Sequence, residues 1–385
     1  MIEIHGAGFR NKGAQMMIRT VIDRLAGAEF CIEPARDRTA EDRDDYGLAA
    51  LCPAVPESPR KFPTAFRRSC LLGRLIPRGF CGARGLVRRQ DTDALVDISG
   101  YGFGDAWNWQ RLRNFAIRAE QYRRRGKPVV LLPQMLGPFE KSESAREFGR
   151  IYAAANLIYA RDRVSLECAR ECVGDDARLR LAPDITIFTQ PGEMPTPDRA
   201  YACVVPNKQL LKKSVDREIW RRVYAERLLA AARRIADAGL HVSVLVHDMA
   251  REDLALAEQL LEDLGPERGS LVREADPLKI KGYIAGAEFI VSSRFHSLVA
   301  ALSSGVPVAV IGWGHKYDML LEDFGMPGMI HHAEDPDAQL IGLVDQLLQT
   351  ERRDTWRGGL LEAKAAMEPA NEAMWREVRG LLGLD

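Results

Sequence analysis

Short apolar runs alternate with longer, helix-like segments along most of the chain. Six runs in the first half are short and apolar enough to be strands: IEIHGAG, ALVDISG, PVVLLPQ, NLIYARD, RLRLAPDITIF and YACVVPN. After the first of them, AQMMIRTVIDRL places apolar residues three and four positions apart, on one face of a helix. The first half therefore predicts strands and helices in regular alternation.

The same alternation restarts near residue 205. A helix is expected over about 216–238, and the strands that follow it are HVSVLVHD, GSLVRE, EFIVSS and VPVAVIG. Continuous apolar strands that alternate with helices are typical of parallel sheets covered on both faces. The sequence therefore predicts an α/β protein with two Rossmann-like domains, residues 1–205 and 206–385, facing across a cleft. We expect the last helices to pack back on the first domain.

Length and composition agree with this organisation. A chain of 385 residues exceeds one ordinary domain, and its 54 basic and 54 acidic residues give no bias toward nucleic acid. Seven scattered cysteines favour a reducing compartment. MIEIHGAGFRNKG lacks the pattern of a signal peptide, and no apolar stretch reaches the ~18 residues of a membrane span. We expect a cytoplasmic protein without a metal site, with Cys168 and Cys172 as buried thiols.

Residues 58–90 depart from the pattern and form a basic insertion in the first domain. They contain nine Lys or Arg and no Asp or Glu, with Phe, Leu and Ile between the cations. One interpretation is a solvated insertion. The other is a surface that meets anionic lipid head groups, or a lipid-pyrophosphate acceptor, at the inner face of the membrane.

Polar residues follow several predicted strands, at the sheet edge where open α/β folds bind ligands. The Gly-rich GAGFRNKGAQ follows the first strand, and Arg161 follows the apolar NLIYA. Each position also has a structural interpretation: a tight turn for the glycines, and an ion pair with Asp162 for Arg161. Further polar residues end other strands, namely Asp184, Asn207, His247 and Asp248.

SSRFHS lies where a strand meets a helix in the second half. Arg294 and His296 are two residues apart, so they point the same way in an extended segment. Lys316 follows the next strand and reaches the same sheet edge. Arg and Lys suit a ligand of dense negative charge, such as a carboxylate plus a phosphate. His can transfer a proton near neutral pH.

The order of these motifs resembles the polysaccharide pyruvyl transferase family. GAGFRNKGA, LVDISGYGFGD, LLPQMLGPF, ARDRVSLE, APDITIF and SSRFHSLVAALSSGVPVAVIGWGHKYDMLLEDFG follow one another over nearly the whole chain. The last is the most specific, because it combines Arg-x-His, an apolar helix, GVPV and a segment that contains a lysine.

The resemblance implies a GT-B-like transferase that uses phosphoenolpyruvate and no cofactor. The product would be a pyruvate ketal across two hydroxyls of a sugar, in a cell-surface polysaccharide or its lipid-linked precursor. Arg161, Arg294, His296 and Lys316 match the donor-site positions of the motifs. We expect His296 to be the acid–base group, with Asp184 or Asp248 as the next candidates, and Arg294 to act with it. Other substrate-binding residues are expected at Gly8, Asn11, Lys12, Gln134, Asn207 and His247.

Two other functions are compatible with the pattern. A GT-B-type glycosyltransferase would use a nucleotide-sugar donor in surface polysaccharide synthesis on the same fold. A carbohydrate-binding scaffold without activity ranks last, because the Arg-x-His pair is intact.

Overall fold

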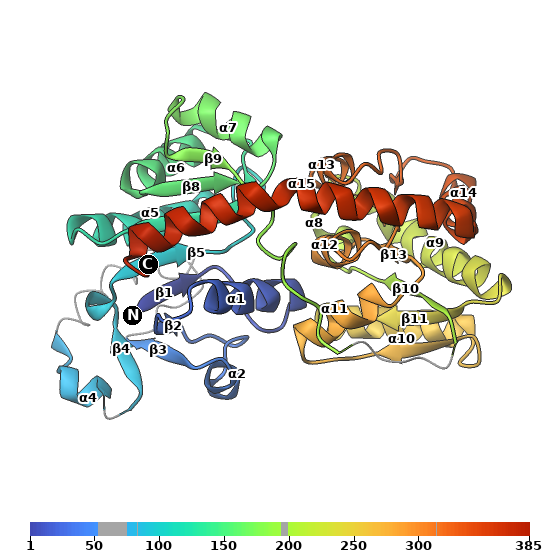
Figure 1. Cartoon of the computed structure of the whole chain (residues 1–385), viewed down its shortest axis with the longest axis horizontal. Coiled ribbons are helices and arrows are strands. Elements are labelled where there is room, and N and C mark those ends of the chain that lie inside the picture. Colours follow the sequence, from blue (N-terminus) through green and yellow to red (C-terminus); the bar gives the residue numbers. More distant parts are fainter. Residues whose placement is uncertain (53–74, 83, 194–198, 313) are drawn as a thin grey trace. The chain divides into compact units, whose positions relative to one another are not determined.

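The computed structural model divides into two compact units, each built on one sheet (Figure 1). The residues it describes are 1–52, 75–82, 84–193, 199–312 and 314–385. Unit 1 consists of Met1–Phe9, Met17–Ile185 and Pro369–Asp385. Unit 2 consists of Arg10–Met16 and Thr186–Glu368.

Unit 1 contains a parallel sheet with the strand order β4-β3-β2-β1-β5-β7-β8-β9, and β6 pairs with β7 beside this path. Strands β5, β7 and β8 are buried along their whole length, as inner parallel strands covered on both faces are. Their bounds are β1 (Ile2–His5), β2 (Phe30–Ile32), β3 (Leu48–Cys52), β4 (Leu86–Arg88), β5 (Ala94–Asp97), β6 (Tyr101–Phe103), β7 (Val129–Leu136), β8 (Leu157–Ala160) and β9 (Leu179–Leu181).

Side-chain caps fix several helix starts in unit 1, among them those of the helices that follow Asn108 and Asp162. Asn108 accepts from the backbone N–H of Gln110, and Asp162 accepts from that of Ser165, which satisfies N–H groups with no partner inside the helix. The helices are α1 (Lys12–Arg24), whose first turn belongs to unit 2, α2 (Ala40–Asp45), α4 (Arg78–Gly82), α5 (Trp109–Arg124), α6 (Ser142–Ala154) and α7 (Arg163–Val173), with a 3-10 turn at Arg89–Asp91.

Unit 2 contains a parallel sheet with the strand order β12-β11-β10-β13-β14-β15. Its central strands, β10 and β13, are entirely buried and belong to the larger apolar core. The bounds are β10 (Tyr201–Val205), β11 (His241–Leu245), β12 (Gly269–Val272), β13 (Ile290–Ser292), β14 (Val308–Ile311) and β15 (Ile330–His331).

Helices connect the strands of unit 2, and the last helix continues into unit 1. They are α8 (Leu210–Lys213), α9 (Arg217–Asp237), α10 (Arg251–Leu264), α11 (Pro277–Ala285), α12 (Phe295–Leu302), α13 (Lys316–Asp323), α14 (Asp337–Leu348) and α15 (Thr350–Leu382). Pro369 lies inside α15 and is the first residue of the helix assigned to unit 1. No described helix combines the length and apolar composition needed to span a membrane.

The predicted domain boundary at residue 205 is wrong. β10 was expected to end the first sheet, but it pairs with β11 and β13 at the centre of the second. A buried strand has the same local sequence pattern in either sheet, so only its pairing partners show which sheet it belongs to. The units separate after Ile185, and Arg10–Met16 belongs to unit 2 rather than to the first domain.

The basic insertion lies largely outside the described residues, which omit 53–74 and 83. For its last two arginines, a solvated insertion is the wrong interpretation. Arg88 ends the edge strand β4 and pairs with Asp91 at 2.6 Å, and Arg89 forms a buried pair with Glu3 at 3.1 Å. Membrane contact through the rest of the segment stays a prediction.

Candidate active site

The turn between β13 and α12 carries Arg294 and His296. Arg294 is the N-cap residue of α12 and has extended backbone. Its backbone N–H donates to Oγ of Ser292 over 2.9 Å, and Ser297 Oγ donates to the Arg294 carbonyl over 2.8 Å. These short-range bonds fix the direction in which the Arg294 side chain leaves the strand end.

Two carboxylates hold the guanidinium of Arg294. Its Nη1 donates to Oδ2 of Asp248 over 3.3 Å, and its Nη2 contacts the carboxylate of Asp253. All three side chains are at most 7% exposed. Burial lowers the pKa of Arg294, and the negative charge of Asp248 opposes this shift. Nε of Arg294 is buried and has no hydrogen-bond partner among the described residues.

Ser293 is held by residues from three other elements. Nδ2 of Asn207 donates to the Ser293 carbonyl over 2.6 Å, and the Tyr317 hydroxyl donates to the same carbonyl over 2.9 Å. The Tyr224 hydroxyl bonds Oγ of Ser293 and accepts from the backbone N–H of Asn207. Oδ1 of Asn207 accepts from the backbone of Gln209. Asn207, expected to bind substrate, therefore fixes the backbone next to Arg294.

The imidazole of His296 packs directly on the backbone of Gly13. A Cβ added at Gly13 would lie 2.4 Å from Cγ and Nδ1 of the ring, closer than real Cβ contacts come. Phe295 meets the ring edge-on, with 5.5 Å between centroids. The Gly-rich segment GAGFRNKGA thus supplies a surface without a side chain against which His296 rests.

The segment Arg10–Met16 is bound to the loop after β11. The backbone N–H of Lys12 donates to the His247 carbonyl, and that of Met249 donates to the Arg10 carbonyl, each over 3.0 Å. Oδ1 of Asn11 accepts from the backbone N–H of Gly13 over 3.0 Å. Nζ of Lys12 donates to Oε1 of Gln15 over 2.7 Å and to the Ala275 carbonyl over 2.9 Å. The predicted residues Asn11 and Lys12 therefore lie beside the predicted His247.

His247 is a buried imidazole surrounded by cations. It is 1% exposed, and neither ring nitrogen has a hydrogen-bond partner among the described residues. Burial holds the pKa of His247 well below its usual value, and the charges of Arg294, His296 and Lys12 lower it further. The ring is therefore neutral at neutral pH and offers one donor and one acceptor nitrogen.

Lys316 begins α13, after β14. Its Nζ lies 5.8 Å from the centroid of the Phe295 ring and 5.1 Å from that of Tyr317. Phe295 also contacts His296. Unit 2 thus brings together six predicted positions: Asn11, Lys12, Asn207, His247, Arg294 and His296, with Lys316 joined to them through Phe295.

Unit 1 contains the remaining predicted residues. Arg161 follows β8, is 8% exposed, and donates from Nη1 to Oδ2 of Asp184 over 3.3 Å. The expected alternative partner, Asp162, instead caps α7. Gln134 lies in β7, is entirely buried, and donates from Nε2 to Oδ1 of Asp97 over 3.1 Å. Gly8 faces Asp37, whose carboxylate a Cβ at Gly8 would meet at 2.1 Å.

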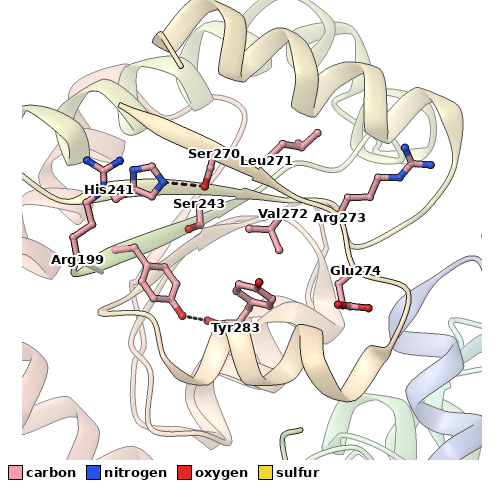
Figure 2. Close-up of a pocket in the computed structure, with 10 residues that line it drawn as sticks. Arg199, His241, Ser243, Ser270, Leu271, Val272, Arg273, Glu274 and Tyr283 are labelled. Carbon is pink, nitrogen blue, oxygen red and sulfur yellow. Dashed lines mark hydrogen bonds between the residues drawn. The ribbon is translucent and has the colours of Figure 1, made fainter. Parts of the chain in front are cut away.

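A separate pocket of about 500 Å³ lies on one face of the second sheet, beside α11 (Figure 2). Two of its hydrogen bonds join Nε2 of His241 to Oγ of Ser270 at 2.9 Å and the Tyr201 hydroxyl to the Tyr283 carbonyl at 2.7 Å. None of the residues predicted from the sequence lines it. The lining consists of Arg199, Tyr201, His241, Ser243, Ser270, Leu271, Val272, Arg273, Glu274 and Tyr283.

The sequence model of one protein family, described as polysaccharide pyruvyl transferase, matches residues 11–315. The chain belongs to this family. We call the polar residues gathered around Arg294 in unit 2 the unit 2 cluster. The match includes this cluster apart from Arg10, Lys316 and Tyr317, which lie just outside residues 11–315. It confirms the family predicted from the motifs and identifies the chain as a member of a transferase family of polysaccharide biosynthesis. No protein among the curated sequences matches the chain.

Solved structures confirm the GT-B-like fold expected of this family member. A UDP-glucosyltransferase from Polygonum tinctorium capable of glucosylating indoxyl is 13% identical, with a TM-score of 0.61 over 99% of this chain and 98% of that one. MnaA of S. aureus, in a co-structure with UDP, is 11% identical, with a TM-score of 0.63 over 100% and 97%. MurG of Acinetobacter baumannii is 10% identical, with a TM-score of 0.51 over 96% and 99%. At these identities the likeness concerns the fold.

Several residues of the cluster escaped the sequence analysis of this family member. Asp253 is in an amphipathic helix, where a buried acid has no distinct pattern, and Tyr224 and Tyr317 read as ordinary core residues. Arg10 lies in the Gly-rich motif, 3.5 Å from Asp248, and is not among the predicted positions. Within the described ranges, no group of three His, Cys, Asp or Glu side chains could hold a metal ion. Cys168 and Cys172, expected to be buried, are partly exposed.

Proposed function

We propose that the chain transfers the enolpyruvyl group of phosphoenolpyruvate to two hydroxyls of a sugar, forming a pyruvate ketal. The acceptor is a sugar of a cell-surface polysaccharide or of its lipid-linked precursor. The observation that carries this proposal is the unit 2 cluster, in a member of the pyruvyl transferase family, where Arg294, Lys12 and His296 gather around the end of β13.

The donor carries a carboxylate and a phosphate, so it needs several cations. Arg294 is oriented by Asp248 and Asp253, and its Nε–H has no partner among the described residues, which supports its role as a cation for the donor. Lys12 and Lys316 supply compact positive charges, which can bind the oxygens of a phosphate in many orientations. Arg161 of unit 1, on the ARDRVSLE motif, stays a predicted donor-binding residue.

The reaction balances without an oxidant or a reductant. In the first step, a hydroxyl oxygen bonds to C2 of the donor, the electron pair of the C2–C3 double bond takes a proton at C3, and the hydroxyl proton goes to a base. In the second step, the bond from C2 to the phosphate oxygen breaks and inorganic phosphate leaves with the electron pair. Another hydroxyl oxygen bonds to C2 in its place and loses its proton.

His296 is the proposed proton donor to C3. It stands in the first turn of α12, two residues after Arg294, and its ring is fixed by Gly13 and Phe295. A general acid must lie within hydrogen-bond reach of the atom that takes its proton, and a fixed imidazole next to an anion-binding group supports this role.

The proposal is tested by incubating the protein with phosphoenolpyruvate and a panel of sugar acceptors. Release of phosphate and a ketal product detected by mass spectrometry are the expected result. Phosphate release without acceptor, or no use of phosphoenolpyruvate with any acceptor, would argue against it.

A nucleotide-sugar donor is the second candidate, because a similar structure, that of S. aureus MnaA, is a co-structure with UDP. Thermal unfolding separates the two. A donor present at about 100 times its dissociation constant stabilises the folded protein by about 2.7 kcal/mol. We expect this shift with phosphoenolpyruvate and not with nucleotide sugars, and the reverse would favour the glycosyltransferase.

A further inference from the structure

His5 and Asp97 form a hydrogen-bonded pair at the carboxyl edge of the first sheet. They end the neighbouring parallel strands β1 and β5 and stand opposite each other in the register. Nδ1 of His5 lies 2.6 Å from Oδ2 of Asp97. The carboxyl edge of an open parallel sheet is where such folds bind their ligands. Neither residue is used by the donor chemistry above.

Asp97 is a fully buried carboxylate that receives several donors. Ser99 donates to it from the backbone N–H over 3.1 Å and from Oγ over 2.9 Å, and Nε2 of Gln134 donates over 3.1 Å. Because a carboxylate only accepts, the shared proton with His5 belongs to Nδ1 of the ring. The tautomer of His5 is thereby fixed, and Nε2 holds the free lone pair.

Nε2 of His5 is available to a ligand. The side chain is 23% exposed, and no described residue makes a hydrogen bond to Nε2. The ring is held from behind by Phe115, with 5.0 Å between centroids. Burial and the charge of Arg118 in α5 lower the pKa of His5, while Asp97 on β5 and Glu3 on β1 raise it. The net shift is downward, so the ring is neutral and can accept a proton at neutral pH.

A purely structural pair would look different, as the same unit shows. Glu3, two residues before the end of β1, is also fully buried, but its carboxylate is hydrogen-bonded by Arg89, Arg118 and Tyr122. That network leaves no acceptor facing outward. In the His5–Asp97 pair, by contrast, Nε2 of His5 has no hydrogen-bond partner among the described residues and lies at a sheet edge.

One further observation points to a ligand at this edge. Oε1 of Gln134 is entirely buried and has no hydrogen-bond partner among the described residues. Two glycines let Ser99 pack closely beside the pair and donate to Asp97. Gly6 has φ +95° and would place a Cβ 2.1 Å from Oγ of Ser99, and a Cβ at Gly102 would lie 2.7 Å from Cβ of Ser99.

We propose that His5 is the base for the acceptor, taking the proton of a sugar hydroxyl at Nε2, and that Asp97 is its positioning residue. The hydroxyl oxygen then forms its bond to C2 of the enolpyruvyl group, and the proton on His5 passes to water before the second hydroxyl reacts. The ligand class is a sugar diol, which can donate to His5. This inference rests on the proposed function and adds the acceptor side to it.

His5→Asn tests the role directly. The amide nitrogen of Asn can keep the bond to Asp97, but nothing replaces Nε2. We expect acceptor-dependent turnover to fall about 10²- to 10⁴-fold. The KM for phosphoenolpyruvate and the thermal shift that it produces should stay unchanged. His332→Asn, a half-exposed histidine in unit 2, is the matched control and should keep full activity.

Chemical rescue separates a base from a structural residue. His5→Ala should lose activity and regain part of it when imidazole is added, because the His5 side chain is partly exposed and its removal leaves room for the added ring. The pH profile of kcat/KM should lose its acidic limb in this variant, and Asp97→Asn should move that limb. An active wild-type protein with an equally active His5→Asn variant would overturn the inference alone. A wild-type protein that never uses phosphoenolpyruvate would instead overturn the proposed function.

Discussion

The ring of His296 lies on the backbone of Gly13, close enough that a Cβ at position 13 would come within 2.4 Å of Cγ. Gly13→Ala must therefore push the imidazole aside. Because a displacement of about 1 Å can reduce catalysis about 100-fold, we expect turnover to fall by roughly that factor while phosphoenolpyruvate still binds. Gly342→Ala is the control, since a Cβ there meets nothing within 4 Å. Normal turnover in Gly13→Ala would show that the ring position does not matter.

Replacing His296 tests proton transfer itself. His296→Asn keeps the approximate size and some hydrogen bonding but removes the titrating group. Turnover should drop about 10²- to 10⁴-fold, with little change in the melting temperature. Steady-state kinetics and thermal unfolding check both parts. A folded, fully active variant would place the acid elsewhere, with Asp248 and Asp184 next, although each of these already pairs with an arginine.

Arg294 has both a structural and a proposed binding role, which a double variant can separate. Arg294→Lys keeps the charge but loses the planar fork that reaches two carboxylates and a ligand at once. Losing such a charged contact costs about 2–5 kcal/mol, or roughly 30- to 5,000-fold in kcat/KM for phosphoenolpyruvate.

In Arg294→Lys, the carboxylate of Asp253 loses the guanidinium that it contacts. Adding Asp253→Asn removes this unpaired negative charge. We expect the double variant to regain part of the lost melting temperature while kcat/KM stays low. Recovery of kcat/KM together with stability would mean that Arg294 only holds the fold.

The buried His247 predicts how stability depends on pH. Its pKa in the folded protein lies well below the ordinary 6.5, so below pH 6.5 the unfolded chain binds a proton that the folded one does not. The contribution of His247 to the free energy of unfolding is therefore fully present above pH 6.5 and is lost as the pH falls below it. When the pH is lowered from 7.5 to 5.5, the free energy of unfolding of the wild-type protein should fall by about 1.4 kcal/mol more than that of His247→Gln.

Urea unfolding at the two pH values measures this difference, and the other histidines cancel because both proteins contain them. Equal losses would mean that His247 becomes protonated without unfolding.

The sequence predicted the layered α/β architecture because buried parallel strands such as β7 and β14 leave an apolar signature of their own. It also predicted Arg294 and His296, because charged residues that directly follow such a strand are conspicuous. His5 and Asp97 stand at strand ends too, in IEIHG and LVDISG. Their pairing depends on which strands are neighbours, and that is decided by the fold.

Pairing across long sequence distances explains the other errors. β10 was assigned to the wrong sheet because no local feature distinguishes the two. Asp253 was missed because its only mark is contact with Arg294, 41 positions along the chain in a different element. Physical proximity of this kind leaves no periodicity to detect.

The discontinuous units have a consequence for synthesis on the ribosome. Arg10–Met16 is made roughly 10–50 s before its partners His247 and Ala275 at usual elongation rates. Unit 1 needs late residues too, because Glu372 and Glu377, which pair with Arg24 and Arg180, lie far beyond these arginines along the chain. Neither unit can therefore complete its contacts until these later segments have been made, and the chain must hold two partly formed sheets until then.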